Sequence, residues 1–196
     1  MKIIIATNNH HKVSEFRALL ANTGLEVFSM QDVGIKATTN ETGLTYEENA
    51  ALKAEAIRKY TDELVIADDS GLEIEALENF PGLNSARYAN QMGGNKNANR
   101  AIIDQMKNVT NRRAKFVAVI ALCNFKSETL LFRGESLGQI SQTEEGTGGF
   151  GYDPIFFSNE AQKSFALLDD SQKNRFSHRG KAVAKLIKFL IAENAI

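Results

Sequence analysis

The sequence predicts an α/β protein, and three patterns support this prediction. Near the start, an apolar run at 2–6 and a polar turn precede an amphipathic stretch at 13–20, which is the pattern of a strand, a loop and a helix. Two later runs, at 114–125 and 129–140, are rich in residues that favour strands. The tail at 178–194 has apolar residues at the spacing of a core-facing helix.

The other elements follow in order along the chain. A short strand is expected at 26–29, and a helix is expected after Thr45, which can cap it together with Glu48 three residues later. Lys53 lies on that helix. The run at 64–67 is expected to be a strand that carries the next two residues at its carboxyl end.

The second half contains a mixed segment followed by a predicted strand pair. A polar and partly helical stretch is expected between Pro81 and Lys107. The two long β-type runs after it are expected to pair antiparallel. With 196 residues and no obvious linker, the chain is predicted to be one domain, 1–196.

Composition and charge exclude several classes of protein. Hydrophobic residues make up 43% and charged residues 24%, which argues against intrinsic disorder. The formal net charge of -1 lacks the basic excess of proteins that bind polymeric nucleic acid. No apolar run is long enough to span a membrane, and none begins the chain as a signal sequence would. The single cysteine, Cys123, fits a reducing compartment. We therefore expect a cytoplasmic protein with no membrane or polymeric nucleic acid partner.

The first polar turn is a candidate phosphate-binding loop. It comprises Thr7, Asn8, Asn9, His10, His11 and Lys12. Backbone amides and Asn9 at a helix start, with Lys12 in the first turn, can bind phosphate oxygens. An ordinary polar helix cap explains the segment equally well, because the spacing of a P-loop is absent. The two histidines have no partners at zinc-ligand spacing, so they are expected in a solvated loop.

Two adjacent aspartates follow the predicted strand at 64–67. Asp68 and Asp69, with Glu41 from another loop, could supply oxygen ligands for Mg²⁺, which commonly takes one or two carboxylates plus substrate phosphates. Neighbouring strand residues face opposite ways, so only one of the pair needs to face a ligand. Asp69 is predicted to be that residue. An Asx turn with solvated carboxylates is the alternative interpretation.

A glycine-rich segment runs from Gly146 to Gly151. It matches the dinucleotide fingerprint GxGxxG in letters, but the Tyr152-Asp153-Pro154 that follows cannot start the required helix. The glycines allow close approach of a ligand, and Phe150 could stack on a nucleobase. A bulge with core aromatics is the more favoured interpretation for Tyr152, and also for the phenylalanines at 156–157.

Cations gather at the start of the last predicted helix. Ser177 can cap it, which places His178 and Arg179 at the end where the helix dipole disfavours positive charge. A bound anionic or polar ligand would compensate for this. Lys173 is close enough in sequence to contribute, although a solvated first turn remains an alternative.

Taken together, these segments resemble the inosine triphosphate pyrophosphatase family of house-cleaning nucleotide hydrolases. Six family patterns occur in order over almost the whole chain: T-x-N-x-x-K, E-T-G-x-T-[FY]-x-E-N-A, A-D-D-S-G-L, G-x-x-S-A-R-Y, G-G-F-G-Y-D-P-I-F and S-H-R-G. They occupy residues 7–12, 41–50, 67–72, 82–88, 148–156 and 177–180. Six ordered matches make the resemblance specific.

The resemblance implies a fold and an activity. The fold is a long twisted mixed β-sheet flanked by helices, in two lobes with a central nucleotide cleft. The activity is Mg²⁺-dependent hydrolysis of ITP, dITP and XTP to the monophosphate and pyrophosphate by a cytoplasmic homodimer. The implied metal ligands are Glu41 and Asp69, and the implied catalytic residue is Asp69. The implied substrate-binding residues are Thr7, Asn8, Asn9, His10, His11, Lys12, Lys53, Ser70, Phe150, Gly151, Tyr152, Asp153, Lys173, His178 and Arg179.

A mechanism follows as a hypothesis. Mg²⁺ neutralises the triphosphate, Asp69 activates or positions water for attack on the α-phosphorus, and pyrophosphate leaves from the Lys12 and Lys53 pocket. Donors from Lys173, His178 or Arg179 would suit the 6-keto oxygen of hypoxanthine or xanthine, whereas adenine would leave them unpaired.

The sequence departs from the family pattern at two positions, and two other functions are alternatives to the one that the resemblance implies. Asn8 stands where many relatives have glycine, and Leu167 stands where the family pattern has glutamate. Asparagine tolerates a left-handed backbone better than most residues. A pyrophosphatase of the related Maf type would prefer pyrimidine triphosphates, and a regulatory module would bind nucleotide without hydrolysing it.

Overall fold

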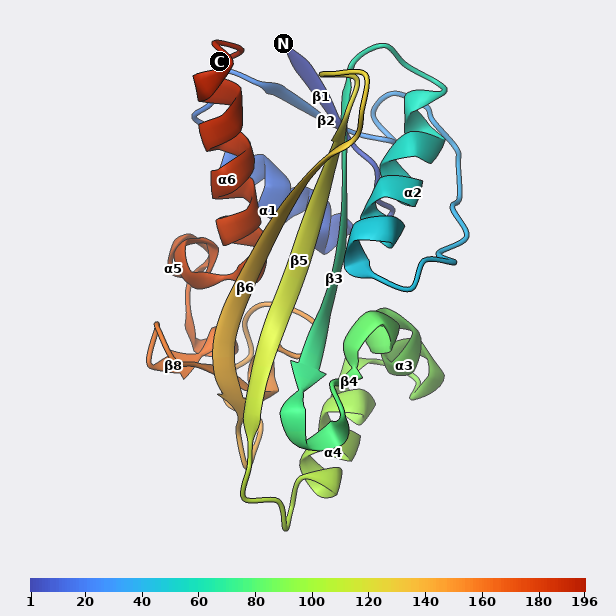
Figure 1. Cartoon of the computed structure of the whole chain (residues 1–196). Helices are drawn as coiled ribbons and strands as arrows, with labels where there is room; N and C mark the ends of the chain where they lie inside the picture. The colour runs from blue at the N-terminus through green and yellow to red at the C-terminus, as the bar shows by residue number, and fades with distance from the viewer. The chain divides into compact units, whose positions relative to one another are not determined.

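The computed structural model describes all residues, 1–196, and contains six α-helices and a sheet of eight strands (Figure 1). The strands are β1 (Lys2–Ile5), β2 (Glu26–Ser29), β3 (Leu64–Ile74), β4 (Phe80–Pro81), β5 (Arg113–Cys123), β6 (Leu130–Ile140), β7 (Phe156–Ser158) and β8 (Lys163–Ser164). The helices are α1 (His10–Leu20), α2 (Tyr46–Arg58), α3 (Ser85–Gln91), α4 (Asn95–Gln105), α5 (Asp170–Phe176) and α6 (His178–Ala192). The sheet order is β2-β1-β3-β5-β6-β7-β8, with β4 paired to β3. The predicted α/β class and mixed sheet are confirmed.

The chain divides into two compact units. Unit 1 comprises 1–69, 118–134 and 179–196, and unit 2 comprises 70–117 and 135–178. Strands β3, β5 and β6 and helix α6 each cross a boundary, so the chain passes repeatedly from one unit to the other. The expectation of one functional domain over 1–196 stays a prediction.

In unit 1, β1 is the central parallel strand. It pairs with β2 on one side, where Ile5 aligns with Ser29, and with β3 on the other, where Ile5 aligns with Ile66. Helices α1 and α6 cover one face of these strands and α2 lies on the other (Figure 1). The core under α1 and α6 is apolar and fully buried, as shown by Phe16 and Leu186, each 0% exposed. Parallel pairing brings the carboxyl ends of β1 and β2 to one edge, where polar loops follow.

Unit 2 has a core rich in aromatic rings. Phe116 of β5 packs against Phe156 at 4.6 Å between ring centroids and stacks parallel to Phe165 at 5.9 Å. Strands β6, β7 and β8 are antiparallel neighbours, with Ile140 aligned to Phe156. Phe116, Phe156 and Phe165 belong to the buried core cluster of unit 2.

One strand boundary was predicted wrongly. The sequence predicted a strand that ends at Ala67, but β3 continues through both aspartates and Ser70 to Ile74. The aspartates are buried and ion-paired, so their polarity does not end the strand. They nevertheless lie just beyond Ile66, the last β3 residue aligned with β1, so the expected sheet edge is retained.

The other expected elements occur close to their predicted bounds. Thr45 caps α2, and its side chain accepts from the Glu48 amide at 3.1 Å. Glu48 itself accepts from the Leu44 amide, one residue before the cap. The stretch after Pro81 contains α3 and α4, and β5 and β6 are neighbours in the sheet. Local capping and apolar spacing therefore determined most of the elements.

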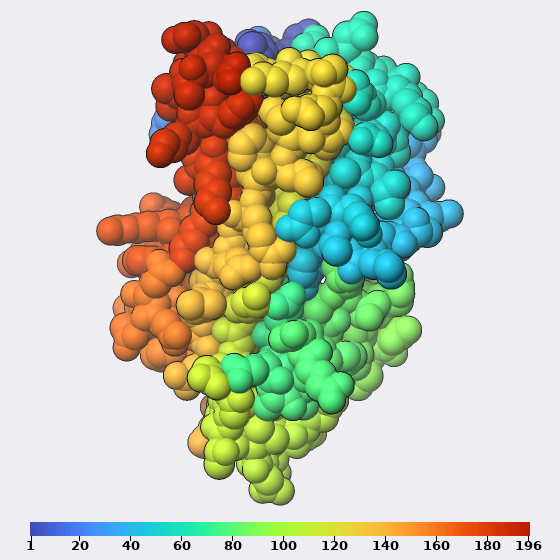
Figure 2. Space-filling view, in the orientation of Figure 1, coloured from blue at the N-terminus to red at the C-terminus, as the bar shows by residue number.

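Part of strand β6 is exposed on the face of the molecule that Figure 2 shows. Leu131 and Leu137 of this strand are 44% and 55% exposed. None of the helices combines the length and the apolar character needed to cross a membrane.

Candidate active site

The turn after β1 is organised as a helix cap. Asn9 has an extended backbone, and its side chain accepts from the amides of His11 at 3.0 Å and Lys12 at 3.4 Å. Thr7 accepts from the Asn9 amide at 3.2 Å. Asn8 does not have a positive φ, so asparagine at this position causes no backbone strain. Asn9 therefore caps α1, and Lys12 lies in the first turn of this helix as predicted; the binding of phosphate by this turn stays a prediction.

A cavity of about 610 Å³ lies beside this turn. It is lined by the turn, by one side of α1 and by the segment after β2, with Thr7, Asn8, His10, Arg17, Asp32 and Lys36 among its polar residues. Arg17 and Asp32 form an ion pair of 2.6 Å within it. The lining is mixed: it includes the cations Arg17 and Lys36 and residues at the start of α1, together with Asp32 and apolar side chains.

Asp68 is the centre of a buried charge network in unit 1. Its Oδ2 accepts from Arg179 Nε at 3.1 Å and Nη2 at 2.8 Å, and its Oδ1 lies 3.0 Å from Lys12 Nζ. Arg179 also pairs with Glu15 of α1. The Asp68 side chain is 0% exposed and that of Arg179 is 2% exposed. This network fixes the position of Lys12 relative to β3.

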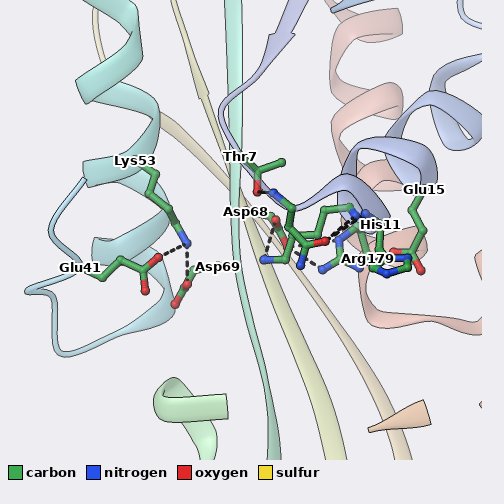
Figure 3. Close-up of polar contacts among 10 residues, drawn as sticks. Thr7, His11, Glu15, Glu41, Lys53, Asp68, Asp69 and Arg179 are labelled. Carbon is green, nitrogen blue, oxygen red and sulfur yellow. Dashed lines mark hydrogen bonds and ion pairs between the residues drawn. The ribbon is translucent and has the colours of Figure 1, made fainter. Parts of the chain in front are cut away.

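Asp69 belongs to a different group on the other side of β3. Lys53 Nζ donates to Asp69 Oδ1 at 2.6 Å and to Glu41 Oε1 at 3.2 Å. Figure 3 shows these three side chains converging from α2, β3 and the loop before α2, while Asp68, Arg179 and Glu15 lie on the opposite side of the strand. The alternation of strand side chains produces this separation. Asp69 was predicted to be the residue of the pair that faces a ligand. In the structure its side chain lies beside those of Lys53 and Glu41.

Burial and charge shift the pKa values of these groups in different directions. Burial raises the pKa of Asp69 above its ordinary value, although Lys53 opposes the shift. Burial also works against the ionised form of Asp68, but Arg179 and Lys12 outweigh it and hold its pKa well below the usual range. Asp69 is thus the better proton acceptor of the pair.

The two lysines differ in the same way. Burial lowers the pKa of Lys12 despite the attraction of Asp68. Burial works against the charge of Lys53 too, but Asp69, Asp68 and Glu41 together raise its pKa. Lys53, which lies between two carboxylates, therefore holds its proton more tightly than Lys12 does.

In unit 2, the glycine-rich segment is a tight turn that requires glycine at specific positions. Gly149 has φ +67°, and a Cβ there would lie 2.2 Å from Asp153 Oδ2. Asp153 uses that oxygen to accept from the Phe150 amide at 2.8 Å. A short 3-10 helix and β7 follow in place of an α-helix, so the segment is not a dinucleotide fingerprint.

Lys173 of α5 joins Asp153 and Phe150 in one buried cluster. Its Nζ is 2.7 Å from Asp153 Oδ2 and 4.5 Å from the centre of the Phe150 ring. Lys173 is 4% exposed and Asp153 is 3% exposed, whereas the Phe150 ring is only half-buried. An aromatic ring is thus presented beside a fixed ammonium, an arrangement that suits a polar planar ligand.

Other contacts anchor this loop from the helices of unit 2. The Tyr152 hydroxyl donates to the Ser85 carbonyl at 2.7 Å, and burial raises its pKa. Asn99 of α4, 2% exposed, donates to the Gly151 carbonyl at 3.2 Å. The core interpretation of Tyr152 is therefore confirmed, and its hydroxyl holds the loop to α3.

The last segment is divided between the units. His178 is buried in unit 2, where its ring stacks on Phe116 at 4.7 Å. Arg179 begins the next part of unit 1 and contacts carboxylates there. The anionic compensation expected for this cation at a helix start is provided by Asp68 and Glu15 of the chain itself.

The predicted residues thus occur in two sets. Unit 1 contains 7–12 and Arg179 on one side of β3 and Glu41, Lys53 and Asp69 on the other, and unit 2 contains Phe150 to Asp153, Lys173 and His178. Ser70 lies in β3, half-buried, where unit 2 begins. The sequence analysis did not identify Glu15 or Asn99. Neither residue gave a local signal, because Glu15 pairs with Arg179, 164 positions away, and Asn99 donates to the Gly151 carbonyl, 52 positions away.

Comparisons with known proteins agree on one family. A model of the Ham1 family matches residues 3–189. A Clostridium perfringens protein named dITP/XTP pyrophosphatase is 42% identical over 193 residues, covering 94% of this chain and 95% of that protein. A Leuconostoc mesenteroides protein of the same name is 43% identical over 195 residues, covering 97% and 96%.

Solved structures lead to the same family. The Ham1 protein of Staphylococcus aureus has a TM-score of 0.87 and 39% identity, covering 98% of this chain and 100% of that chain. A HAM1 protein from Coxiella burnetii also has a TM-score of 0.87, with 34% identity and coverage of 98% and 99%. Fold and sequence therefore agree over nearly the whole length of the chain.

Proposed function

Because the chain belongs to the Ham1 family, we propose that it hydrolyses dITP, ITP and XTP to the nucleoside monophosphate and pyrophosphate. Relatives about 40% identical to this chain are named dITP/XTP pyrophosphatase, and the similarity extends over nearly their full length. The structural observation that best supports the proposal is the group of Lys53, Asp69 and Glu41. In this group Asp69, whose pKa is raised, lies beside a lysine. The function is removal of deaminated purine nucleotides from the precursor pool.

The triphosphate is the ligand of unit 1. The turn at 7–12 offers a helix start with Lys12, and Lys53 supplies a second cation. Phosphate groups favour such positions because helix-start amides and ammonium groups both attract negative charge. The buried network of Asp68, Arg179 and Glu15 keeps Lys12 in place.

A divalent metal fits the residues present, and we assign it to Glu41 and Asp69. Their oxygens already converge on one cation, the Lys53 ammonium. The structure has no group of three or more His, Cys, Asp or Glu side chains that could hold a metal. The assignment therefore needs an ion such as Mg²⁺, which takes one or two carboxylates and completes its shell with water and phosphate oxygens. When bound, Mg²⁺ would neutralise charge on the phosphates.

Asp69 is the catalytic residue of the proposal. Its carboxylate lies 2.6 Å from Lys53 Nζ and beside Glu41, where it can position a water molecule and accept its proton. The water oxygen forms a bond to the α-phosphorus while the bond from that phosphorus to the bridging oxygen breaks. Pyrophosphate leaves with the electron pair, and Lys12 and Lys53 offset its charge.

The base is the ligand of unit 2. Phe150 offers a ring face, and Lys173 and His178 offer donors for a 6-keto oxygen. Adenine carries an amino group there and would leave such donors unpaired, which can discriminate by a factor of about 10⁴. Gly151, Tyr152 and Asp153 give the loop its shape, and Ser70 contacts the nucleotide. Arg179, which the resemblance assigns to the base, also pairs with Asp68 and Glu15.

Two further assignments are proposals of the same kind. We assign the protein to the cytoplasm, because its one cysteine, Cys123, is buried and fits a reducing compartment. We also assign it a homodimeric state, and size-exclusion chromatography with light scattering tests it.

A substrate panel tests the proposed function. Purified protein is incubated with Mg²⁺ and ITP, XTP, GTP, ATP or dTTP, and pyrophosphate, orthophosphate and nucleotide products are measured. Pyrophosphate and IMP from ITP, with little product from ATP or GTP, are expected. Orthophosphate from ITP would contradict the reaction, a preference for dTTP would favour a Maf-type enzyme, and binding without turnover would favour a regulatory module.

A further inference from the structure

Lys53 occupies an unusual position for a phosphate-binding residue. Its ammonium lies 2.6 Å from Asp69 Oδ1 and 3.2 Å from Glu41 Oε1, the two carboxylates assigned to the metal. The side chain is 13% exposed and that of Asp69 is 9% exposed, so little water screens this contact. A cation of the chain thus lies between the oxygens that a divalent ion would use.

A metal ion and this ammonium compete for the same oxygens. Mg²⁺ binds carboxylate oxygens at roughly 2.0 to 2.1 Å, and Lys53 already donates to one oxygen of each group at hydrogen-bond distance. A divalent ion on those oxygens would also repel an ammonium in contact with them. Occupancy by one cation therefore disfavours the other.

Lysine is suited to leave such a position. Its charge lies at the end of a flexible four-carbon chain, and Lys53 lies in the second half of α2, whose helical backbone does not need to move. Triphosphate oxygens would give the displaced ammonium new partners. Displacement is therefore costly without nucleotide and favourable with it.

We propose that the Lys53 ammonium holds the place of the metal between Glu41 and Asp69 in the free protein, and that metal binding displaces it toward the triphosphate. This inference rests on the metal site of the proposed function. Metal and triphosphate then bind cooperatively, because each removes an obstacle to the other. The lysine also keeps the two carboxylates from repelling each other while no metal is bound.

Metal affinity without nucleotide tests the inference. Mn²⁺ binding to the wild type, Lys53→Met and Lys12→Met is measured by electron paramagnetic resonance. Lys12→Met is the matched control, because it removes a neighbouring cation that pairs with Asp68 and contacts neither ligand. Lys53→Met is expected to bind Mn²⁺ more tightly than both other proteins, by a factor of about 5 to 100 relative to wild type. Affinity equal to or weaker than that of Lys12→Met would overturn the inference.

A second measurement uses the unaltered protein. The reactivity of Lys53 toward an amine reagent is compared by mass spectrometry with and without Mn²⁺, relative to the exposed Lys59 at the end of α2. Mn²⁺ is expected to raise the relative reactivity of Lys53, because the ammonium leaves its carboxylates. Unchanged or lower reactivity at saturating Mn²⁺ would mean that Lys53 stays in place.

The outcomes separate this inference from the proposed function. If the wild type releases pyrophosphate from dITP but Lys53→Met gains no more Mn²⁺ affinity than Lys12→Met, only the displacement is wrong. If neither the wild type nor Lys53→Met binds Mn²⁺ at millimolar concentration, the assigned metal site and the displacement are both wrong.

Discussion

Asp68 and Asp69 are neighbours in β3, yet each is ion-paired with a different set of cations. Asp68 contacts Lys12 and Arg179, whereas Asp69 contacts Lys53. Successive side chains of a strand point to opposite faces, so two adjacent residues can serve two sites. The structure thus separates a carboxylate that organises charge from one that is available for chemistry.

Asp69→Asn is expected to lower turnover far more than it lowers nucleotide binding. Asparagine cannot accept a proton from water, and loss of a general base commonly reduces the rate by a factor of about 10² to 10⁴. Pyrophosphate release and calorimetric binding of ITP measure the two effects. Asp62→Asn, an exposed change outside both sets, serves as the control. Near-normal turnover in Asp69→Asn would contradict the catalytic role of this residue.

Asp68→Asn is expected to affect stability more than any exposed substitution. It removes the main partner of the buried Arg179 guanidinium and one partner of Lys12. Breaking a buried ion pair from one side typically costs about 3 to 5 kcal/mol. Urea unfolding measures this loss, and a change below about 1 kcal/mol, typical of exposed pairs, would show that the network is not structural.

The stability difference between wild type and Asp68→Asn is expected to depend on pH. The pKa of Asp68 is held below its ordinary value by Arg179 and Lys12, against the opposing effect of burial. Its contribution is therefore fully present above the unfolded pKa of about 4 and is lost as the pH falls toward the folded pKa. Thermal unfolding from pH 7 to pH 3 should show the gap narrowing below about pH 4. If the difference in stability between wild type and Asp68→Asn increased as the pH fell, the predicted direction of the pH dependence would be wrong.

Lys173→Met tests the role of the buried lysine in base selection. It should lower the preference for dITP over dATP and also destabilise unit 2, because Asp153 is left buried without its ammonium. The double variant Lys173→Met/Asp153→Asn removes the uncompensated charge. It should recover stability but not selectivity. If selectivity returned along with stability, the lysine would have only a structural role.

Asn99→Leu tests the support of the glycine-rich loop. The substitution removes the hydrogen bond to the Gly151 carbonyl and keeps a side chain of similar size. A loosened loop should raise KM for ITP several-fold while kcat changes less, since unit 1 performs the chemistry. Asn95→Leu, exposed at the start of the same helix, is the matched control. If Asn99→Leu lowered kcat several-fold and left KM unchanged, Asn99 would not act by supporting the loop that binds the base.

The sequence predicted the local elements well because their signals are local. The cap at Asn9, the cap at Thr45 and the apolar spacing of α6 each depend on a few neighbouring residues. The end of β3 was predicted wrongly because polar residues usually end a strand. Here distant cations from α1, α2 and α6 compensate the two aspartates, and no local pattern reveals them.

The site was predicted as a set of residue types, and its internal pairing was not. The ion pairs of Arg179 with Asp68 and Glu15 were not predicted, and its expected contact with the base stays a prediction. The pairing of Lys53 with both assigned metal ligands was also unforeseen. Such contacts join residues 12 to 164 positions apart and depend on the folded arrangement.

The position at which water attacks the triphosphate can be measured with labelled water. ITP is hydrolysed in H₂¹⁸O with Mg²⁺, and the two products are analysed by mass spectrometry. One ¹⁸O atom is expected in IMP and none in pyrophosphate, because water attacks the α-phosphorus. Label in pyrophosphate would place the attack on the β-phosphorus, and labelled orthophosphate would place it on the γ-phosphorus; in either case the proposed hydrolysis at the α-phosphorus would be wrong.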